Sequence, residues 1–414
     1  MSHAIERFDL ECGMRLLVEP MGDVQSVGLT WLLPIGSSVD PPGRQGAATM
    51  LAEWLWRGAG ERDAKAHSDA LDTLGVQRSS QITTHHLRIG ATLIGSRLDD
   101  ALPLLTDLVT APRFDDAPFE AVRDLSIQAI EGLKDEPQQR SMLKLKERHF
   151  PTPFNRSGMG TIADLRAMTP DGARSFWRER AKPQGAIMGV AGAVDPQRLV
   201  DQLNERLADW RGAAPEATVT DEPERGYHHE ADESAQVHIG VAHPAPPETD
   251  ERSVLQRLAV AVLSGGMSGR LFTEVREKRS LCYSVHASYA AGRDRGAVLA
   301  YSGTTPERAQ ETLDVLVAEL RRLRDGADAS EFHRAVVGLK SRLVMQGEST
   351  AARANAIAAD FFTLGRARTL HERADEVDGA SLDAVNDYLR EHPAEDFTVV
   401  TIGPESLTPP KSID

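Results

Sequence analysis

The second half of the chain repeats the order of elements found in the first half, and this repetition constrains the fold more than any other feature. An apolar run at 27–33, typical of a strand, is followed by a Gly/Ser/Pro-rich loop and by helical spacing at 46–56. About 210 residues later, a strand-like run at 236–243 leads into a Pro-rich loop and a helical segment at 253–263. The sequence therefore predicts two homologous domains.

A stretch without a core-facing pattern separates the two copies. Residues 213–226 are rich in Ala, Pro, Thr and Glu, a composition typical of a linker. In the first copy a buried strand is predicted at 185–193, between two helices. Strands and helices in both copies indicate an α+β fold, with domains at 1–212 and 227–414.

Composition and charge exclude several classes of protein. Of the 414 residues 41% are apolar and 26% charged, which is typical of a globular chain with room for two cores. The net charge of −15 disfavours nucleic acid as a partner. Cys12 and Cys282 are the two cysteines and have no metal-type spacing. With no signal-like start and no membrane-length apolar run, we expect a cytoplasmic protein that does not bind membranes.

Residues 46–59, GAATMLAEWLWRGA, resemble the active-site helix of the insulinase or pitrilysin family of zinc peptidases. The family pattern is G-x-A-H-x-L-E-H-x-x-[FW]-[KR]-G-[TA], in which the two His bind zinc from one helical face and the Glu between them is the general base. The resemblance places Thr49, Ala52 and Glu53 at these three positions, and Ala129 at the position of a distal Glu ligand. It implies that this chain has lost its zinc site and holds no cofactor of its own.

Three further stretches are similar to the same family. Residues 153–161 are similar to its P-Y-G-x-x-x-x-G-T loop, and residues 189–196 to its V-x-G-D-V-x-P turn. Residues 265–284 closely match G-G-M-S-S-R-L-F followed by [IV]-R-E-K-x-G-L-x-Y-S. The resemblance implies the metallohydrolase fold of that family, two homologous domains that each have a mainly antiparallel sheet with helices packed on it.

An Arg and a Tyr in the last of these stretches are the residues to which the resemblance gives a function. In bacterial two-chain members of the family, one chain binds zinc and the other projects this Arg and Tyr into the shared cavity. The corresponding residues here are Arg276 and Tyr283. A guanidinium and a phenol can donate hydrogen bonds to a substrate carbonyl and to the oxyanion that forms on attack. The resemblance thus implies a non-catalytic subunit of a heterodimer, with an unfolded peptide as substrate and a homologous H-x-x-E-H subunit that carries the zinc.

Two alternatives remain open at this point. One is a degenerate scaffold or assembly subunit without a role in proteolysis. The other is a stand-alone protein with a relocated metal site at His85 or His86, joined by Glu53 and perhaps His67. Because adjacent strand residues face opposite ways, at most one of the two neighbouring histidines could join such a site.

Overall fold

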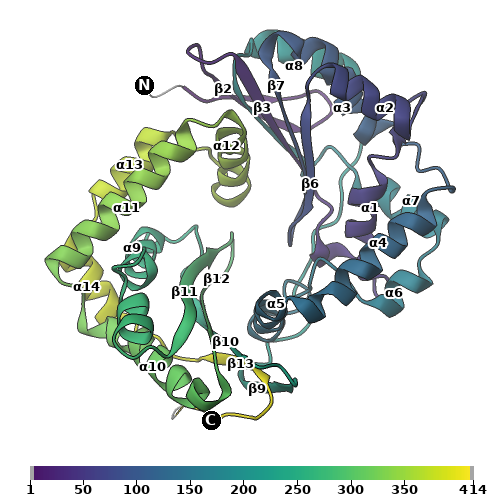
Figure 1. The fold of residues 1–414 in the computed structure, drawn as a ribbon. Helices are drawn as coiled ribbons and strands as arrows, with labels where there is room; N and C mark the ends of the chain where they lie inside the picture. The colour runs from purple at the N-terminus through teal and green to yellow at the C-terminus, as the bar shows by residue number, and fades with distance from the viewer. Residues whose placement is uncertain (1–3, 411–414) are drawn as a thin grey trace. The chain divides into compact units, whose positions relative to one another are not determined.

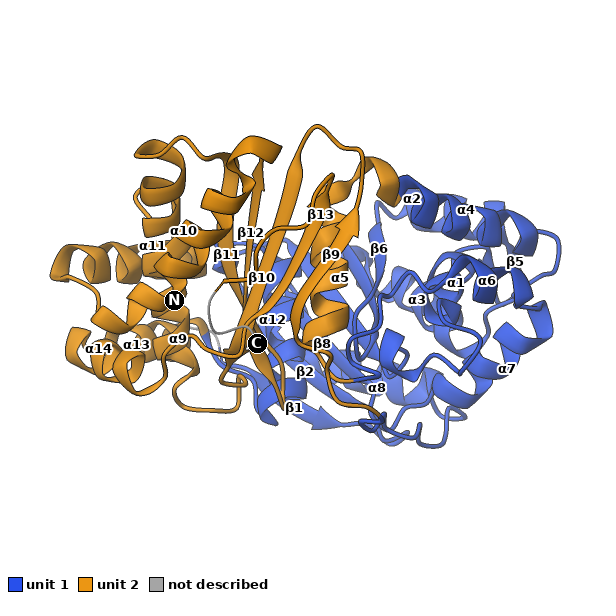
Figure 2. Ribbon diagram, turned by 90° about the horizontal axis from the view of Figure 1, so that it is seen from below, with its two compact units in different colours: residues 1–132, 152–220, 345–369 blue, residues 133–151, 221–344, 370–414 orange. Residues whose placement is uncertain are grey.

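The computed structural model describes residues 4–410, which form two compact units (Figures 1 and 2). Unit 1, blue in Figure 2, consists of residues 1–132, 152–220 and 345–369, and unit 2, orange, of residues 133–151, 221–344 and 370–414. Each unit therefore contains one segment from the opposite half of the sequence, while the domain boundaries inferred from the repeat stay a prediction. Among the described residues, no helix is both long and apolar enough to cross a bilayer.

Unit 1 is built on a six-stranded sheet with the order β1-β2-β8-β3-β7-β6. The β2–β8 pair is parallel and the other pairs are antiparallel. The strands are β1 (Glu6–Asp9), β2 (Arg15–Pro20), β3 (Ser26–Leu33), β6 (Gln77–Ile82), β7 (Leu87–Ile94) and β8 (Ile187–Gly192), with a small separate ribbon of β4 (Gly58–Ala59) and β5 (Arg62–Asp63). β3 reads as a continuous apolar run because both faces of the sheet are covered.

Helices of unit 1 cover both faces of this sheet. One face carries the main core, where Trp31 and Leu29 of β3 meet residues of the surrounding helices. The helices are η1 (Ser37–Val39), α1 (Ala47–Trp54), α2 (Ala64–Thr73), η2 (Gly95–Arg97), α3 (Leu98–Thr110), α4 (Phe119–Gly132), α6 (Ile162–Ala167), α7 (Pro170–Arg180), α8 (Pro196–Arg206) and α12 (Thr350–Leu364). On the other face lies α12, whose Ile357 and Ala358 pack on Leu17 and Ile187.

Glycines let α12 approach the sheet at backbone distance. A Cβ on Gly189 would lie 2.2 Å from the Ala354 carbonyl oxygen, and one on Gly28 would lie 2.5 Å from the backbone at Thr350. The helix is also held by a buried ion pair, in which Arg353 contacts Glu19 of β2 at 2.7 Å. A segment of the C-terminal half thus completes unit 1.

Unit 2 repeats the sheet of unit 1 with the order β9-β13-β10-β12-β11. The strands are β9 (Gly226–Ala231), β10 (Val237–Ala245), β11 (Cys282–Ala291), β12 (Gly296–Thr304) and β13 (Thr398–Gly403). As in unit 1, one pair is parallel, here the β13–β9 pair at the edge of the sheet, and the rest are antiparallel. The matching orders confirm the α+β class and two mainly antiparallel sheets with helices packed on them.

The helices of unit 2 also lie on both faces of their sheet. They are η3 (Leu133–Asp135), α5 (Pro137–His149), α9 (Ser253–Ser264), η4 (Phe272–Glu277), η5 (Pro306–Arg308), α10 (Ala309–Arg322), η6 (Leu323–Asp325), α11 (Ala329–Gly347), α13 (Leu370–Asp378) and α14 (Leu382–Glu391). Val241 and Ile239 face the larger core, with α9 and α10. On the opposite face Leu145 of α5 packs on Ala242 and Leu299. Helix α5, from the N-terminal half, is therefore the counterpart of α12.

The tryptophans and the tyrosines belong to different units. All five tryptophans, at 31, 54, 56, 177 and 210, belong to unit 1. All five tyrosines, at 227, 283, 289, 301 and 388, belong to unit 2. Tryptophan emission consequently reports on unit 1.

Candidate functional site

The helix that resembles the zinc-binding helix begins at a buried aspartate. The carboxylate of Asp40 accepts hydrogen bonds from the backbone N–H groups of Gly46 at 2.7 Å and Ala48 at 2.9 Å. It thereby satisfies two of the donors left free at the first turn of α1. Burial raises the pKa of Asp40 to about 7. Sequence reasoning missed this cap, because Asp40 lies six residues before Gly46 and outside the usual N-cap position.

Thr49, at the position of the first zinc ligand, is engaged with the protein itself. Its hydroxyl donates a hydrogen bond to the carbonyl of Gly158. Gly160 of the same loop lies so close to the backbone just before α1 that a Cβ there would be 2.2 Å from the Gln45 carbonyl oxygen and 2.5 Å from the Cα of Gly46. Two stretches that were singled out by resemblance, 46–59 and 153–161, therefore pack against each other in unit 1.

The other three positions that correspond to the family's zinc site, Ala52, Glu53 and Ala129, include one side chain that could bind a metal. Ala52 is buried, and its backbone carbonyl accepts a hydrogen bond from Ser80. Glu53 on α1 and Ala129 on α4 are exposed. Zinc sites need three or four convergent ligands, and here Glu53 alone has a metal-binding side chain beside a Thr hydroxyl that is already bonded. The residues present do not fit a zinc ion.

The histidines considered for a relocated metal site lie in other surroundings. His85 and His86 lie in the turn between β6 and β7, not on a strand as expected, and His86 packs edge-on against Phe362 at 4.3 Å between ring centroids. Burial lowers the pKa of His86 to about 3. His67 is buried in α2. Among residues 4–410 no three His, Cys, Asp or Glu side chains are grouped so that they could hold a metal.

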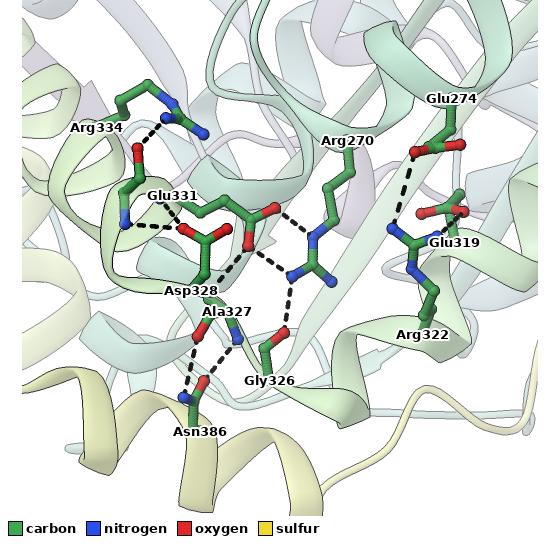
Figure 3. A network of polar contacts seen from close by, with 11 residues as sticks. Arg270, Glu274, Glu319, Arg322, Gly326, Ala327, Asp328, Glu331, Arg334 and Asn386 are labelled. Atoms are coloured by element: carbon green, nitrogen blue, oxygen red, sulfur yellow. Dashed lines mark hydrogen bonds and ion pairs between the residues drawn. The ribbon is translucent and has the colours of Figure 1, made fainter. Parts of the chain in front are cut away.

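Residues 270–279, the segment that carries Arg276, are held in place by ion pairs of Arg270 and of Glu274 (Figure 3). Arg270 forms two hydrogen bonds of 2.7 Å with the carboxylate of Glu331, and a third of 2.7 Å with the Gly326 carbonyl. Such a bidentate pair fixes both position and orientation. It ties the start of the segment to the first turn of α11.

Glu274 fixes the next part of the segment. Its buried carboxylate accepts hydrogen bonds from Lys278 at 2.7 Å and Arg279 at 2.8 Å, and Arg322 lies at 3.9 Å. The hydrogen bonds from Lys278 and Arg279 lower the pKa of Glu274 to about 2. Two of the three cations in R-E-K-R, Lys278 and Arg279, are thus ion-paired within unit 2, where they share one carboxylate.

Arg276 is the cation of this stretch that is held by aromatic rings. Its guanidinium carbon lies 4.9 Å from the Phe272 ring centroid and 5.2 Å from that of Tyr283. Among the described residues, no carboxylate lies within ion-pair distance of it, and its side chain donates no hydrogen bond. Stacking of this kind positions a guanidinium while its N–H donors remain available.

Tyr283 is presented by an irregularity in the edge strand β11. The β11–β12 register passes from Cys282 opposite Thr304 to Ser284 opposite Gly303, so Tyr283 is the extra residue of a bulge. Bulges re-aim a side chain, and the Tyr283 side chain is 82% exposed. The preceding turn places Ser280 at φ 52°, where the family pattern has Gly. The two residues named by resemblance are thus in contact, with Tyr283 exposed and Arg276 half-buried, although sequence reasoning did not foresee that Phe272 would join them.

The fold and these two regions define a class: a two-domain protein of the metallopeptidase type, built from a duplicated α+β unit. Residues 19–161 match the family model described as Insulinase (Peptidase family M16), and residues 167–339 match the model described as Peptidase M16 inactive domain. The chain belongs to this insulinase family.

Relatives and solved structures agree with this assignment over nearly the whole chain. The chain is 25% identical to the uncharacterized zinc protease YmxG of Bacillus subtilis, over 98% of this chain and 100% of the relative. A crystal structure of a peptidase M16 inactive domain from Pseudomonas fluorescens superimposes with a TM-score of 0.87 at 18% identity, covering 98% of this chain and 100% of the other. The crystal structure of a protease from Helicobacter pylori superimposes with a TM-score of 0.84 at 17% identity, covering 98% of this chain and 100% of the other.

Proposed function

We propose that this chain is the non-catalytic subunit of a heterodimeric zinc metallopeptidase and supplies Arg276 and Tyr283 to an active site on its partner. The partner is a homologous insulinase-family chain with an intact H-x-x-E-H motif, which holds the zinc. The substrate is an unfolded peptide, and the complex is cytoplasmic. This chain alone binds no zinc and cleaves no peptide.

One observation carries the proposal: the Arg276 guanidinium lies against two aromatic rings and has no carboxylate partner among the described residues. A structural arginine is expected to be neutralised as Arg270 and Arg279 are. Leaving the donors of a partly buried guanidinium unpaired makes sense where a ligand completes them. The exposed phenol of Tyr283 adds a second donor beside it.

The chemistry that this pair can perform is electrostatic. Both side chains can donate hydrogen bonds to a peptide carbonyl, and these bonds strengthen as negative charge develops on its oxygen. Neither side chain needs to transfer a proton in this role. The chain would thus raise the rate of a reaction for which the partner provides the zinc and the base.

The test is a mixing experiment with purified subunits. This chain is mixed with a zinc-containing insulinase-family chain from the same organism, and cleavage of a fluorogenic unfolded peptide is followed. Arg276→Ala should lower kcat/KM roughly 100-fold, the size seen when one oxyanion donor is removed. Tyr283→Phe should lower it roughly tenfold, as for a lost hydrogen bond.

The matched control is Arg324→Ala, which removes an exposed arginine of unit 2 whose one ion pair is 3.9 Å long. It should cleave like the wild-type chain. If Arg276→Ala and Tyr283→Phe also cleave like the wild-type chain, the active-site role is wrong and the scaffold alternative stands. Stoichiometric zinc in the purified single chain would contradict the division of labour between the two subunits.

A further inference from the structure

Phe272, the second aromatic residue in contact with the Arg276 guanidinium, lies outside the core of unit 2. Its neighbours Leu271 and Val275 are fully buried in that core, whereas Phe272 is half-buried and belongs to no core cluster. An aromatic ring placed at the rim of a core, and not in it, contributes little to the packing of that core. Its contact with Arg276 is therefore the feature that gives the ring a role.

The local backbone explains how Phe272 reaches Arg276. Residues Phe272–Glu277 form a π-helix, a rare conformation that is often found at functional sites. Phe272 and Arg276 are four residues apart and lie on one face of this turn, where the guanidinium carbon is 4.9 Å from the ring centroid. The pairs Arg270–Glu331 and Glu274–Lys278 hold the two ends of the turn. The backbone is therefore fixed independently of Phe272.

We infer that Phe272 is a positioning residue, which together with Tyr283 clamps the Arg276 guanidinium in the orientation needed to meet a peptide carbonyl. This inference rests on the proposed function of Arg276. Without the Phe272 ring, the guanidinium keeps one aromatic contact, with an exposed tyrosine on an edge strand. Its donors are then less well oriented, because four side-chain torsions are free to rotate.

The experiment compares Phe272→Leu with Phe272→Tyr, which keeps the aromatic face. Arginine reactivity is measured with phenylglyoxal and quantified for each residue by mass spectrometry, with exposed Arg324 as the internal reference. Phe272→Leu should raise the modification rate of Arg276 about two- to fivefold, the factor that corresponds to one exposed cation–π contact. Phe272→Tyr should leave the rate at the wild-type value. Should Phe272→Leu fail to fold, Phe272→Met provides the same test with a flexible side chain of similar size.

Cleavage by the mixed subunits provides the second measurement. Phe272→Leu should lower kcat about two- to fivefold with KM unchanged, since orientation matters most in the transition state. Phe272→Tyr should restore kcat. Unchanged reactivity of Arg276 in Phe272→Leu overturns the inference, even if Arg276→Ala abolishes cleavage. A different outcome is that Phe272→Leu raises the reactivity of Arg276 while the Arg276→Ala variant cleaves at the wild-type rate. That result would support the positioning role of Phe272 but refute the proposed function of Arg276.

Discussion

The buried ion pair between α12 and β2 gives the sharpest prediction about stability. The Arg353 Nε donates a hydrogen bond of 2.8 Å to the carboxylate of Glu19, and the Arg353 Nη2 lies 2.7 Å from the same carboxylate. The side chains of Arg353 and Glu19 are 1% and 2% exposed. Replacing Arg353 by Met keeps most of the side-chain volume but leaves the Glu19 carboxylate buried without its counter-charge. Removing one partner of a buried pair typically costs about 3–5 kcal/mol. We expect this loss in the free energy of unfolding of unit 1.

The assay is urea unfolding followed by tryptophan emission, which reports on unit 1. Arg166→Met is the matched control, because Arg166 is exposed on α6 in the same unit and should change stability by less than about 0.5 kcal/mol. The double variant Glu19→Leu/Arg353→Met removes both charges and should regain most of the loss. A loss below about 1 kcal/mol for Arg353→Met, or a double variant no more stable than the single one, would refute the reasoning.

Three other features predict the direction in which the stability of a unit should change. Ser280→Gly should stabilise unit 2 by about 0.5–1 kcal/mol, because φ at this position is 52°, a value that glycine adopts without strain. The measurement is urea unfolding followed by near-ultraviolet circular dichroism of the tyrosines, and an unchanged midpoint would contradict the prediction. Gly189→Ala should destabilise unit 1 by about 1–3 kcal/mol by tryptophan emission, because its methyl group meets the Ala354 carbonyl; wild-type stability would show that α12 can move. Burial lowers the pKa of His149 to about 3 and of His243 to about 4. Because the unfolded chain binds these protons near pH 6.5, unit 2 should lose about 1.4 kcal/mol per pH unit per histidine from pH 6.5 toward 4, and equal urea midpoints at pH 7 and 5 would contradict this.

Much of the fold follows from local pattern. The predicted strand at 27–33 is β3 (Ser26–Leu33), and the helical spacing at 253–263 is α9 (Ser253–Ser264). Periodicity reports which residues face a core, so a repeated order of elements leads correctly to a repeated sheet. The same reasoning explains why the α+β class was predictable without an alignment.

The exchange of α5 and α12 could not be predicted in this way. Helical spacing shows that a segment has a buried face but not which sheet that face covers, because the partner lies far away in sequence. The small residues at Gly28 and Gly189 permit the close approach of α12, yet glycine in a strand can equally mark a bulge or a tight bend.

For the candidate site, the sequence supplied the residues and the structure supplied their relationship. Thr49, Ala52, Glu53 and Ala129 follow from alignment to a motif, and Arg276 and Tyr283 from a second one, and their roles stay predictions. That Arg276 and Tyr283 touch depends on a π-helix, a left-handed turn at Ser280 and a bulge, none of which has a dependable sequence signal.

The exchanged helices also affect how the chain can fold while it is being synthesised. Unit 1 includes residues 345–369, so the N-terminal sheet lacks one of its covering layers until these residues have been translated. Until then Glu19 has no counter-charge, and Leu17 and Ile187 lack their partners on α12. Domains usually fold as units in the order of synthesis. Here the first sheet gains its second covering layer only after residues 345–369 have been synthesised, so the N-terminal half cannot complete its own unit first.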